Sequence, residues 1–200
     1  MRPAAHLAAL TAFTVAIVAF SSCSPAEPEA PPPLAGAAIG GPFELTSESG
    51  ETVAWSDFDG QYRTVYFGYA YCPDVCPTDT QRAMAGLDLF EDAEPDLAAQ
   101  VQPLFVTIDP ERDTPEVLAE FTANFHPRLV GLTGDPETIE EVAKSFAVFY
   151  ARGEDAPGGG YLMDHSNVTY LFGPEGEPIA TLPTDQGPEA VAEELAKWVR

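Results

Sequence analysis

Two cysteines and one histidine are the residues of this 200-residue chain best suited to metal chemistry. Cys72 and Cys76 stand four positions apart in the run Gly-Tyr-Ala-Tyr-Cys-Pro-Asp-Val-Cys-Pro, and His165 follows much later, directly after Asp164. Thiolates and imidazoles are ligands that soft and borderline metal ions prefer. With only three cysteines and three histidines in the chain, these residues are the first candidates for a site.

The spacing of Cys72 and Cys76 permits several kinds of chemistry. Four positions apart on one helical turn, their Cα atoms can lie about 6 Å apart, which suits either a disulfide or a shared metal ion. Because the loop leads into a predicted helix, the backbone N–H groups and the helix dipole favour the thiolate form. A purely structural disulfide is the alternative in an oxidising compartment. Such a short loop, however, offers little entropic stabilisation.

His165 has a structural alternative too, as a hydrogen-bonded residue before a strand. Asp164 can orient or charge-tune its ring as an outer partner. The glycine-rich stretch 158–160 can bring the ring over the thiolates. The other histidine of the domain, His126, ends a helical pattern, where an imidazole can serve the last carbonyls without any metal, so we interpret it as structural.

The first 23 residues are predicted to be an export signal. Arg2 precedes an apolar run from Leu7 to Phe20, about 14 residues, whereas a bilayer-spanning helix needs about 20. The small residues before Cys23 are similar to a bacterial lipoprotein processing site, which predicts lipidation of Cys23; an uncleaved anchor is the alternative. Both place the protein on the cell membrane, with its domain facing the periplasm or the outer side of the cytoplasmic membrane.

Residues 24–40 are rich in proline, alanine and glutamate and are predicted to form a disordered tether. Residues 41–200 remain for one globular domain. The whole chain carries 32 acidic against 9 basic side chains, a formal charge of -23. This balance argues against nucleic acid or anionic lipid as a partner, whereas a metal or a cationic partner is easier to accommodate. An acidic surface that only keeps the domain soluble is the alternative.

Alternating apolar runs and helix-start signals predict an α/β sandwich with a mixed central sheet and flanking helices. The expected strands are a hairpin of residues 43–46 and 52–55 ahead of the main sheet, then 63–69, 101–108, 129–132, and a second hairpin of 168–172 and 179–182. Helices are expected just beyond Cys76, where Thr78 and Gln81 form a capping-box pattern, and from Thr114, from Asp135 and near the chain end. The cysteine loop then follows a buried strand, where ligands bind in such sheets.

These residues together resemble the Sco/SenC family of thioredoxin-fold copper chaperones, which act in cytochrome c oxidase assembly. The resemblance covers essentially all of the exported domain, and its most specific part is the combination of the cysteine loop, the aspartate-proline segment and the Asp-His pair. The matching segments are 41–43, 66–69, 72–77, 109–115, 131–134 and 164–166. Ala70 and Gly173 depart from the threonine and aspartate expected in most members, and neither corresponds to a ligand.

The resemblance implies a thioredoxin-like fold and a copper site formed by Cys72, Cys76 and His165. Two thiolates suit Cu(I) and an added imidazole suits Cu(II), although the same donors also suit zinc. The implied recipient is the dinuclear copper centre in subunit II of cytochrome c oxidase. Copper loading requires reduced thiols, so a disulfide between Cys72 and Cys76 would block it, and a thioredoxin-like reductant is implied as a partner.

Two other functions use the same side chains. In a thiol–disulfide oxidoreductase, or a peroxidase, Cys72 would attack and Cys76 would resolve the mixed disulfide. The three residues between the cysteines, in place of two, and Asn167, near where thioredoxin-like enzymes carry a cis-proline, disfavour this as the main role. A redox or copper sensor needs no transfer step and remains a third interpretation.

Overall fold

The computed structural model describes residues 30–155 and 159–200. The chain divides into two compact units, Met1–Ala30 and Pro31–Arg200, and every element described below belongs to the second. The predicted export signal, Cys23 and the start of the predicted tether lie outside the described residues. Among helices in the described ranges, none combines the length and apolar character that a bilayer crossing requires.

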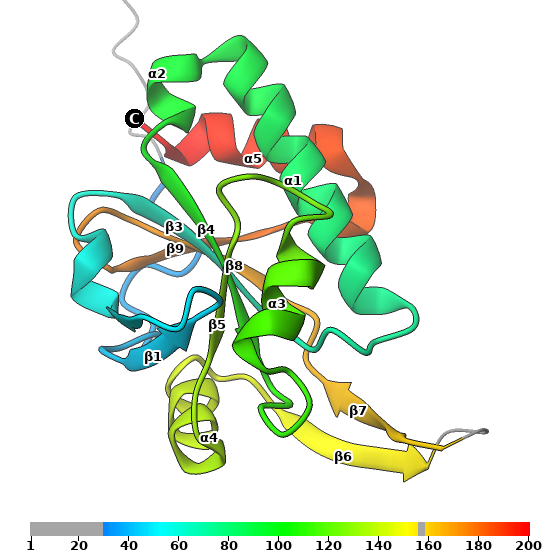
Figure 1. The fold of residues 1–200 in the computed structure, drawn as a ribbon. Coiled ribbons are helices and arrows are strands. Elements are labelled where there is room, and N and C mark those ends of the chain that lie inside the picture. Colours follow the sequence, from blue (N-terminus) through cyan, green and yellow to red (C-terminus); the bar gives the residue numbers. More distant parts are fainter. Residues whose placement is uncertain (1–29, 156–158) are drawn as a thin grey trace, which may run out of the picture. The chain divides into compact units, whose positions relative to one another are not determined.

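The predicted mixed sheet is present and contains seven strands, and two more strands form a separate ribbon (Figure 1). The strands are β1 (Glu44–Ser47), β2 (Thr52–Ala54), β3 (Tyr62–Gly68), β4 (Val101–Thr107), β5 (Val130–Thr133), β6 (Tyr150–Asp155), β7 (Tyr161–His165), β8 (Thr169–Phe172) and β9 (Pro178–Leu182). The helices are α1 (Val75–Ala93), α2 (Pro95–Ala98), α3 (Pro115–Thr122), α4 (Pro136–Ser145) and α5 (Pro188–Trp198), with 3-10 turns η1 (Trp55–Phe58) and η2 (Thr184–Gln186). The sheet order is β2-β1-β5-β4-β3-β8-β9, and β6 pairs with β7.

The connections between the strands place the helices in layers. β3, β4 and β5 are parallel neighbours, so α1 and α3 cross over in the same direction and, by the right-handed rule, lie on one face of the sheet. The chain then returns through α4 to β8, which pairs antiparallel with β3. Helix α4 lies on the other face, because Phe146 just after it packs against Phe67, whereas Phe121 of α3 packs against Phe105, whose side chain points the opposite way from that of Phe67. Helix α5 packs along α1 (Figure 1). At their contact, a Cβ on Gly86 would lie 2.5 Å from Val191.

Strand β3 is the central element that carries the cysteine loop, and all seven of its residues are buried. Its side chains alternate between the two faces of the sheet. Phe67 packs against Phe146, which follows α4, at 5.3 Å between ring centroids, whereas Tyr66 packs against Phe105 of β4 at 6.0 Å. Full burial of one such aromatic side chain contributes about 1.5–3 kcal/mol. The loop after Gly68 therefore starts from a firmly fixed point.

Helix α1 begins earlier than the sequence predicts. It starts at Val75, so Cys76 lies in its first turn, and the predicted capping box is wrong: the Thr78 hydroxyl donates to the Asp74 carbonyl at 2.8 Å. The Cys76 N–H donates instead to the Cys72 sulfur at 3.3 Å. A sulfur acceptor thus satisfies one of the N–H groups that a helix start leaves without a partner. Pro77 is tolerated in the first turn because its position needs no donor.

Two predictions about the N-terminal part of the domain are also wrong. The β1–β2 hairpin does not stand ahead of the sheet but forms its edge, since β1 pairs antiparallel with β5. Residues 34–40 are docked on the domain instead of forming a disordered tether. The Leu34 N–H donates to the Ile179 carbonyl and the Gly40 N–H to the Ser145 carbonyl, each at 2.9 Å. These backbone hydrogen bonds hold the segment that precedes β1 against the domain.

The ribbon of β6 and β7 was not predicted from the sequence, which suggests only a glycine-rich stretch before His165. The two strands are antiparallel, with Tyr150 opposite His165 and Arg152 opposite Met163, and the register shifts between Arg152 and Asp155. His165 is therefore the last residue of a strand. Its position depends on where this ribbon lies relative to the cysteine loop.

Candidate metal centre

The structure brings Cys72, Cys76 and His165 together. Their possible ligand atoms all lie within 4.8 Å of one another, and Nε2 of His165 is 3.1 Å from Sγ of Cys76. The histidine comes from the end of β7, 89 positions beyond Cys76, whereas the cysteines come from the loop after β3 and the start of α1. Three donors of types that bind soft metal ions thus meet in one place.

The backbone around the cysteines leaves room for their sulfur atoms. At Gly68, where β3 ends, a Cβ would lie 3.1 Å from the Cys76 sulfur and 2.8 Å from the Tyr66 ring, so any side chain would crowd the site. The chain then turns, with the Cys72 N–H donating to the Tyr69 carbonyl at 3.2 Å. Cys76 is fully buried, whereas Cys72 keeps 8% of its surface exposed. Cys72 is therefore the sulfur nearer to solvent.

The two thiols differ in acidity, and no disulfide joins them. A hydrogen bond from the Cys76 thiol lowers the pKa of Cys72 more than burial raises it, and His165 and the backbone N–H groups of Cys76 and Asp74 lower it further. The same hydrogen bond, together with burial, raises the pKa of Cys76. Cys72 is therefore the thiolate of the pair, and Cys76 holds its proton.

His165 presents one ring nitrogen to the sulfur atoms. Its Nδ1 lies 3.0 Å from the backbone carbonyl oxygen of Ser166, and because a carbonyl only accepts, Nδ1 carries a hydrogen there. In the neutral ring the Nε2 lone pair then faces the cysteines. Burial lowers the pKa of His165, but hydrogen bonds to the Cys72 thiolate and the Ser166 carbonyl outweigh it, so the net pKa is raised. A raised pKa favours a hydrogen on Nε2, and that hydrogen would have to leave before a metal ion could bind there.

Asp164, predicted as the outer partner of His165, has an exposed side chain. Neighbouring residues of a strand point to opposite faces, so it lies away from the ring, and the contact with Nδ1 falls to the Ser166 carbonyl. An influence of Asp164 through its charge remains a prediction. Sequence reasoning missed another acid, Asp79, which is buried in α1 three positions after Cys76 and interacts electrostatically with His165. Burial raises its pKa, and the charge of Arg82, a hydrogen bond with Thr184 and, least, the charge of His165 oppose that rise.

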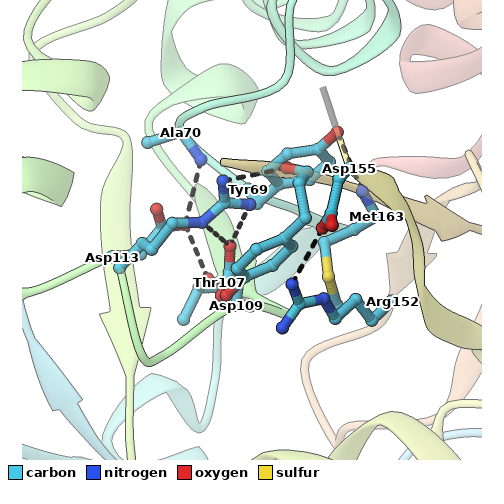
Figure 2. Close-up of polar contacts among 10 residues, drawn as sticks. Tyr69, Ala70, Thr107, Asp109, Asp113, Arg152, Asp155 and Met163 are labelled. Atoms are coloured by element: carbon cyan, nitrogen blue, oxygen red, sulfur yellow. Dashed lines mark hydrogen bonds and ion pairs between the residues drawn. The ribbon is translucent and has the colours of Figure 1, made fainter. Parts of the chain in front are cut away.

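Asp113 is a second residue that the sequence alone does not point to, and it connects the cysteine loop to the loop after β4. Its Oδ2 accepts hydrogen bonds from the Ala70 N–H at 2.9 Å and from the Thr107 hydroxyl at 2.7 Å (Figure 2). In the sequence, the segment 109–115 indicates only a family motif and a helix start. Its acid is a structural anchor of the loop that holds both cysteines.

A second group of possible ligands consists of Asp88, Glu91 and His126. Here Nδ1 of His126 accepts from the Arg128 N–H at 3.0 Å, which leaves the ring hydrogen on Nε2, facing Asp88 at 3.3 Å. The Arg128 guanidinium also holds Glu91 at 2.9 Å. Burial lowers the pKa of His126, with Asp88 opposing. These contacts describe an ion-paired cluster and agree with the structural role predicted for His126.

A mixed sheet with a two-cysteine loop after its central parallel strand and a histidine before the next hairpin defines a thioredoxin-like protein. The fold is shared with the thioredoxin domain of a thiol-disulfide oxidoreductase from Bacteroides vulgatus, at a TM-score of 0.57 and 18% identity over 81% of this chain and 96% of that one. At that identity the likeness concerns the fold alone. The predicted fold class is confirmed.

The chain belongs to the SCO1/SenC family, whose profile matches residues 32–200. It is 38% identical over 164 residues to the human mitochondrial SCO1 homolog, covering 81% of this chain and 53% of that protein. The chain thus spans about half the length of this curated relative. The crystal structure of Arabidopsis thaliana ScoI with copper bound has a TM-score of 0.75 and 35% identity, over 80% of this chain and 98% of that one.

A further solved relative, BsSco, is described as a member of the Sco family of cytochrome c oxidase assembly proteins. Its structure matches with a TM-score of 0.62 and 24% identity, over 86% of this chain and all of that one. The family resemblance seen in the sequence is confirmed by the family profile and by the human relative.

Proposed function

We propose that this protein is a copper chaperone that binds one copper ion through Cys72, Cys76 and His165 and supports assembly of cytochrome c oxidase. The observation that carries the proposal is the approach of two thiols and an imidazole nitrogen to within 4.8 Å of one another. Family membership and the copper-bound relative support copper over zinc as the cargo, because the donor set alone suits both ions.

The chemistry of loading follows from the protonation of the site. Copper would replace the proton of the Cys76 thiol and any proton on Nε2 of His165, so binding weakens as the pH falls. Two thiolates satisfy Cu(I), whereas Cu(II) gains from the imidazole. Cys72 is the less buried of the two cysteines, so an acceptor would displace its sulfur from the ion before that of Cys76.

The test is metal analysis of the reduced protein beside three variants. We expect one copper ion per chain, no binding by Cys72→Ala or Cys76→Ala, and a loss chiefly of Cu(II) binding by His165→Ala. Cys23→Ala is the matched control, since it removes a cysteine outside the site and leaves copper binding unchanged. An electron paramagnetic resonance spectrum of Cu(II) that is identical in His165→Ala and the unmodified protein would refute the third ligand.

The recipient that we propose is the dinuclear copper centre in subunit II of cytochrome c oxidase, with a thioredoxin-like reductant keeping Cys72 and Cys76 reduced. The family and the description of BsSco support a role in oxidase assembly. Mixing the copper-loaded protein with the metal-free soluble domain of subunit II is expected to produce the absorbance of the dinuclear centre. Persistence of all copper on the chaperone, with a reduced acceptor present, argues against direct delivery.

The membrane location is part of the proposal. The N-terminal sequence supports an anchor, through a lipid on Cys23 or through an uncleaved signal, with the domain outside the cytoplasm. Cell fractionation with Cys23→Ala separates the two forms, because only the lipoprotein is released from the membrane by this change. Mass spectrometry of the N-terminal peptide provides the direct check.

Thiol–disulfide exchange is a second candidate, favoured by the unequal acidity of the pair. The Cys72 thiolate would attack a partner disulfide and release one partner thiolate. Cys76, once deprotonated, would then attack the Cys72 sulfur, release the second partner thiolate and leave a Cys72–Cys76 disulfide. Turnover in a disulfide-reduction assay without copper, unaffected by His165→Ala, would favour this function.

A further inference from the structure

Arg112 connects the segments on which the metal site depends. Its guanidinium lies 3.7 Å from the centroid of the Tyr161 ring and donates to the Tyr161 carbonyl at 2.9 Å. The same group pairs with the buried carboxylate of Asp109, in the loop after β4. On its other sides it approaches the rings of Tyr69 and Tyr71 in the cysteine loop, at 5.6 and 5.2 Å. One side chain thus joins β7, the loop after β4 and the cysteine loop.

Two hydroxyl groups reinforce this connection, and Figure 2 shows the one of Tyr69 beside Met163. The Tyr161 hydroxyl donates to Asp109 at 2.8 Å, and the Tyr69 hydroxyl accepts from the Met163 N–H at 3.2 Å. Tyr69 stands three positions before Cys72, and Met163 stands two positions before His165. We call Tyr69, Asp109, Arg112 and Tyr161 the ribbon clamp. Its contacts are made between the cysteine loop and the strand that ends in the imidazole.

The contacts of Arg112 require its planar fork. It donates to a carboxylate and a carbonyl in different directions while stacking on an aromatic ring, and a lysine ammonium reproduces neither the fork nor the stacking. Arg152 provides an internal contrast, since it also lies over the Tyr161 ring, at 4.1 Å. Its ion pair, however, is with Asp155 on its own strand and is exposed to solvent. Arg152 therefore does not join the ribbon to the loops.

We propose that Arg112 is a positioning residue that holds His165 over the two cysteines by clamping the β6–β7 ribbon to the cysteine loop. This inference rests on the copper-binding function proposed above, in which the clamp sets the affinity for Cu(II) relative to that for Cu(I). A fixed imidazole favours Cu(II), which uses the third ligand, over Cu(I), which two thiolates satisfy. Loosening the clamp adds the cost of ordering the ribbon to Cu(II) binding.

The first test uses the metal-free, reduced protein. In Arg112→Gln, we expect amide hydrogen exchange of residues 161–165 to accelerate at least tenfold, while exchange in β3 and β4 is unchanged. Arg152→Gln is the matched control and leaves ribbon exchange as it was. Unchanged exchange in Arg112→Gln, or equal acceleration in both variants, would overturn the proposal. Because this measurement involves no copper, it stands or fails independently of the chaperone function.

The second test measures copper. Arg112→Gln and Arg112→Lys should each lower the affinity for Cu(II) at least tenfold more than that for Cu(I), whereas Arg152→Gln changes neither. Equal losses for the two ions, or full rescue by lysine, would contradict the positioning role. Should Arg112→Gln fail to fold, Tyr69→Phe removes one hydrogen bond of the clamp and is expected to act in the same direction, with the exposed Tyr71→Phe as its control.

Discussion

Replacement of Asp113 by asparagine is expected to remove a pH dependence from the stability of the fold. Asp113 is fully buried, and burial is the main reason that the pKa of its carboxyl rises from 3.8 to about 6, against the hydrogen bonds from Thr107 and Ala70. Since the folded pKa exceeds the unfolded value, folding favours the protonated acid. The contribution of this group to stability is therefore complete below pH 3.8 and is lost as the pH rises through about 6.

The size of the effect follows from the two pKa values. One pKa unit corresponds to about 1.36 kcal/mol, so the ionised carboxylate costs the folded state about 3 kcal/mol above pH 7. Asparagine has the same shape and does not ionise, although its buried amide hydrogens cost about 1–3 kcal/mol at every pH. Urea unfolding of the reduced protein and of Asp113→Asn, from pH 3.5 to 7.5, measures the difference. We expect the free energy of unfolding of the unmodified protein to fall by about 3 kcal/mol relative to the variant.

A second variant checks the cause. Because the Thr107 hydroxyl stabilises the carboxylate, Thr107→Val should raise the pKa of Asp113 further and extend the pH dependence to higher pH. The reasoning would be refuted if the free energies of unfolding of the unmodified protein and of Asp113→Asn differed by a constant amount across this pH range. That result would mean that the buried acid keeps its ordinary pKa.

Three further predictions concern packing and thiol reactivity. Gly86→Ala should lower the free energy of unfolding, measured in urea, by about 1 kcal/mol. The cost of overpacking against Val191, about 1–3 kcal/mol, exceeds the gain in helix propensity, which is up to about 1 kcal/mol, and a more stable variant would contradict this. Gly68→Ala should weaken copper binding with little loss of secondary structure, since its Cβ would press on the Cys76 sulfur, and unchanged affinity in a competition titration with a copper chelator would count against that crowding. The rate of alkylation of Cys72 should be nearly independent of pH between 5 and 8, and peptide mapping should find Cys76 unmodified. The alkylation rate of an ordinary thiol would instead fall about tenfold for each unit that the pH is lowered in this range.

The sequence predicts the elements whose signals are local. The apolar runs of β3 and β4 and the Thr-Pro-Glu and Asp-Pro-Glu starts of α3 and α4 appear close to where they are expected, because buried parallel strands and helix caps are determined within a few residues. The proximity of His165 to the cysteines is a different matter. It follows from the family resemblance and not from any local pattern.

The ribbon and its clamp could not be predicted in the same way. Strand β6, Tyr150–Asp155, contains glycine and two acids, residues depleted in strands, so propensity gives no signal there. The role of Arg112 depends on contacts with Tyr161 and Tyr69, which are about 40 to 50 positions away in the chain. The predicted start of α1 is wrong because the group that accepts the N–H of Cys76 is a sulfur, which capping rules for hydroxyl and carboxylate side chains do not include.

That sulfur acceptor links the chemistry of the loop to the order of a long helix. An electron-rich thiolate on Cys72 accepts the N–H at the start of the 19-residue α1, whereas a sulfur shared in a disulfide is a weaker acceptor. Oxidation is therefore expected to weaken this contact and to leave the first turn of α1 less ordered. A protein that touches this loop would distinguish the oxidised from the reduced form by backbone disorder, before any electron or ion is exchanged.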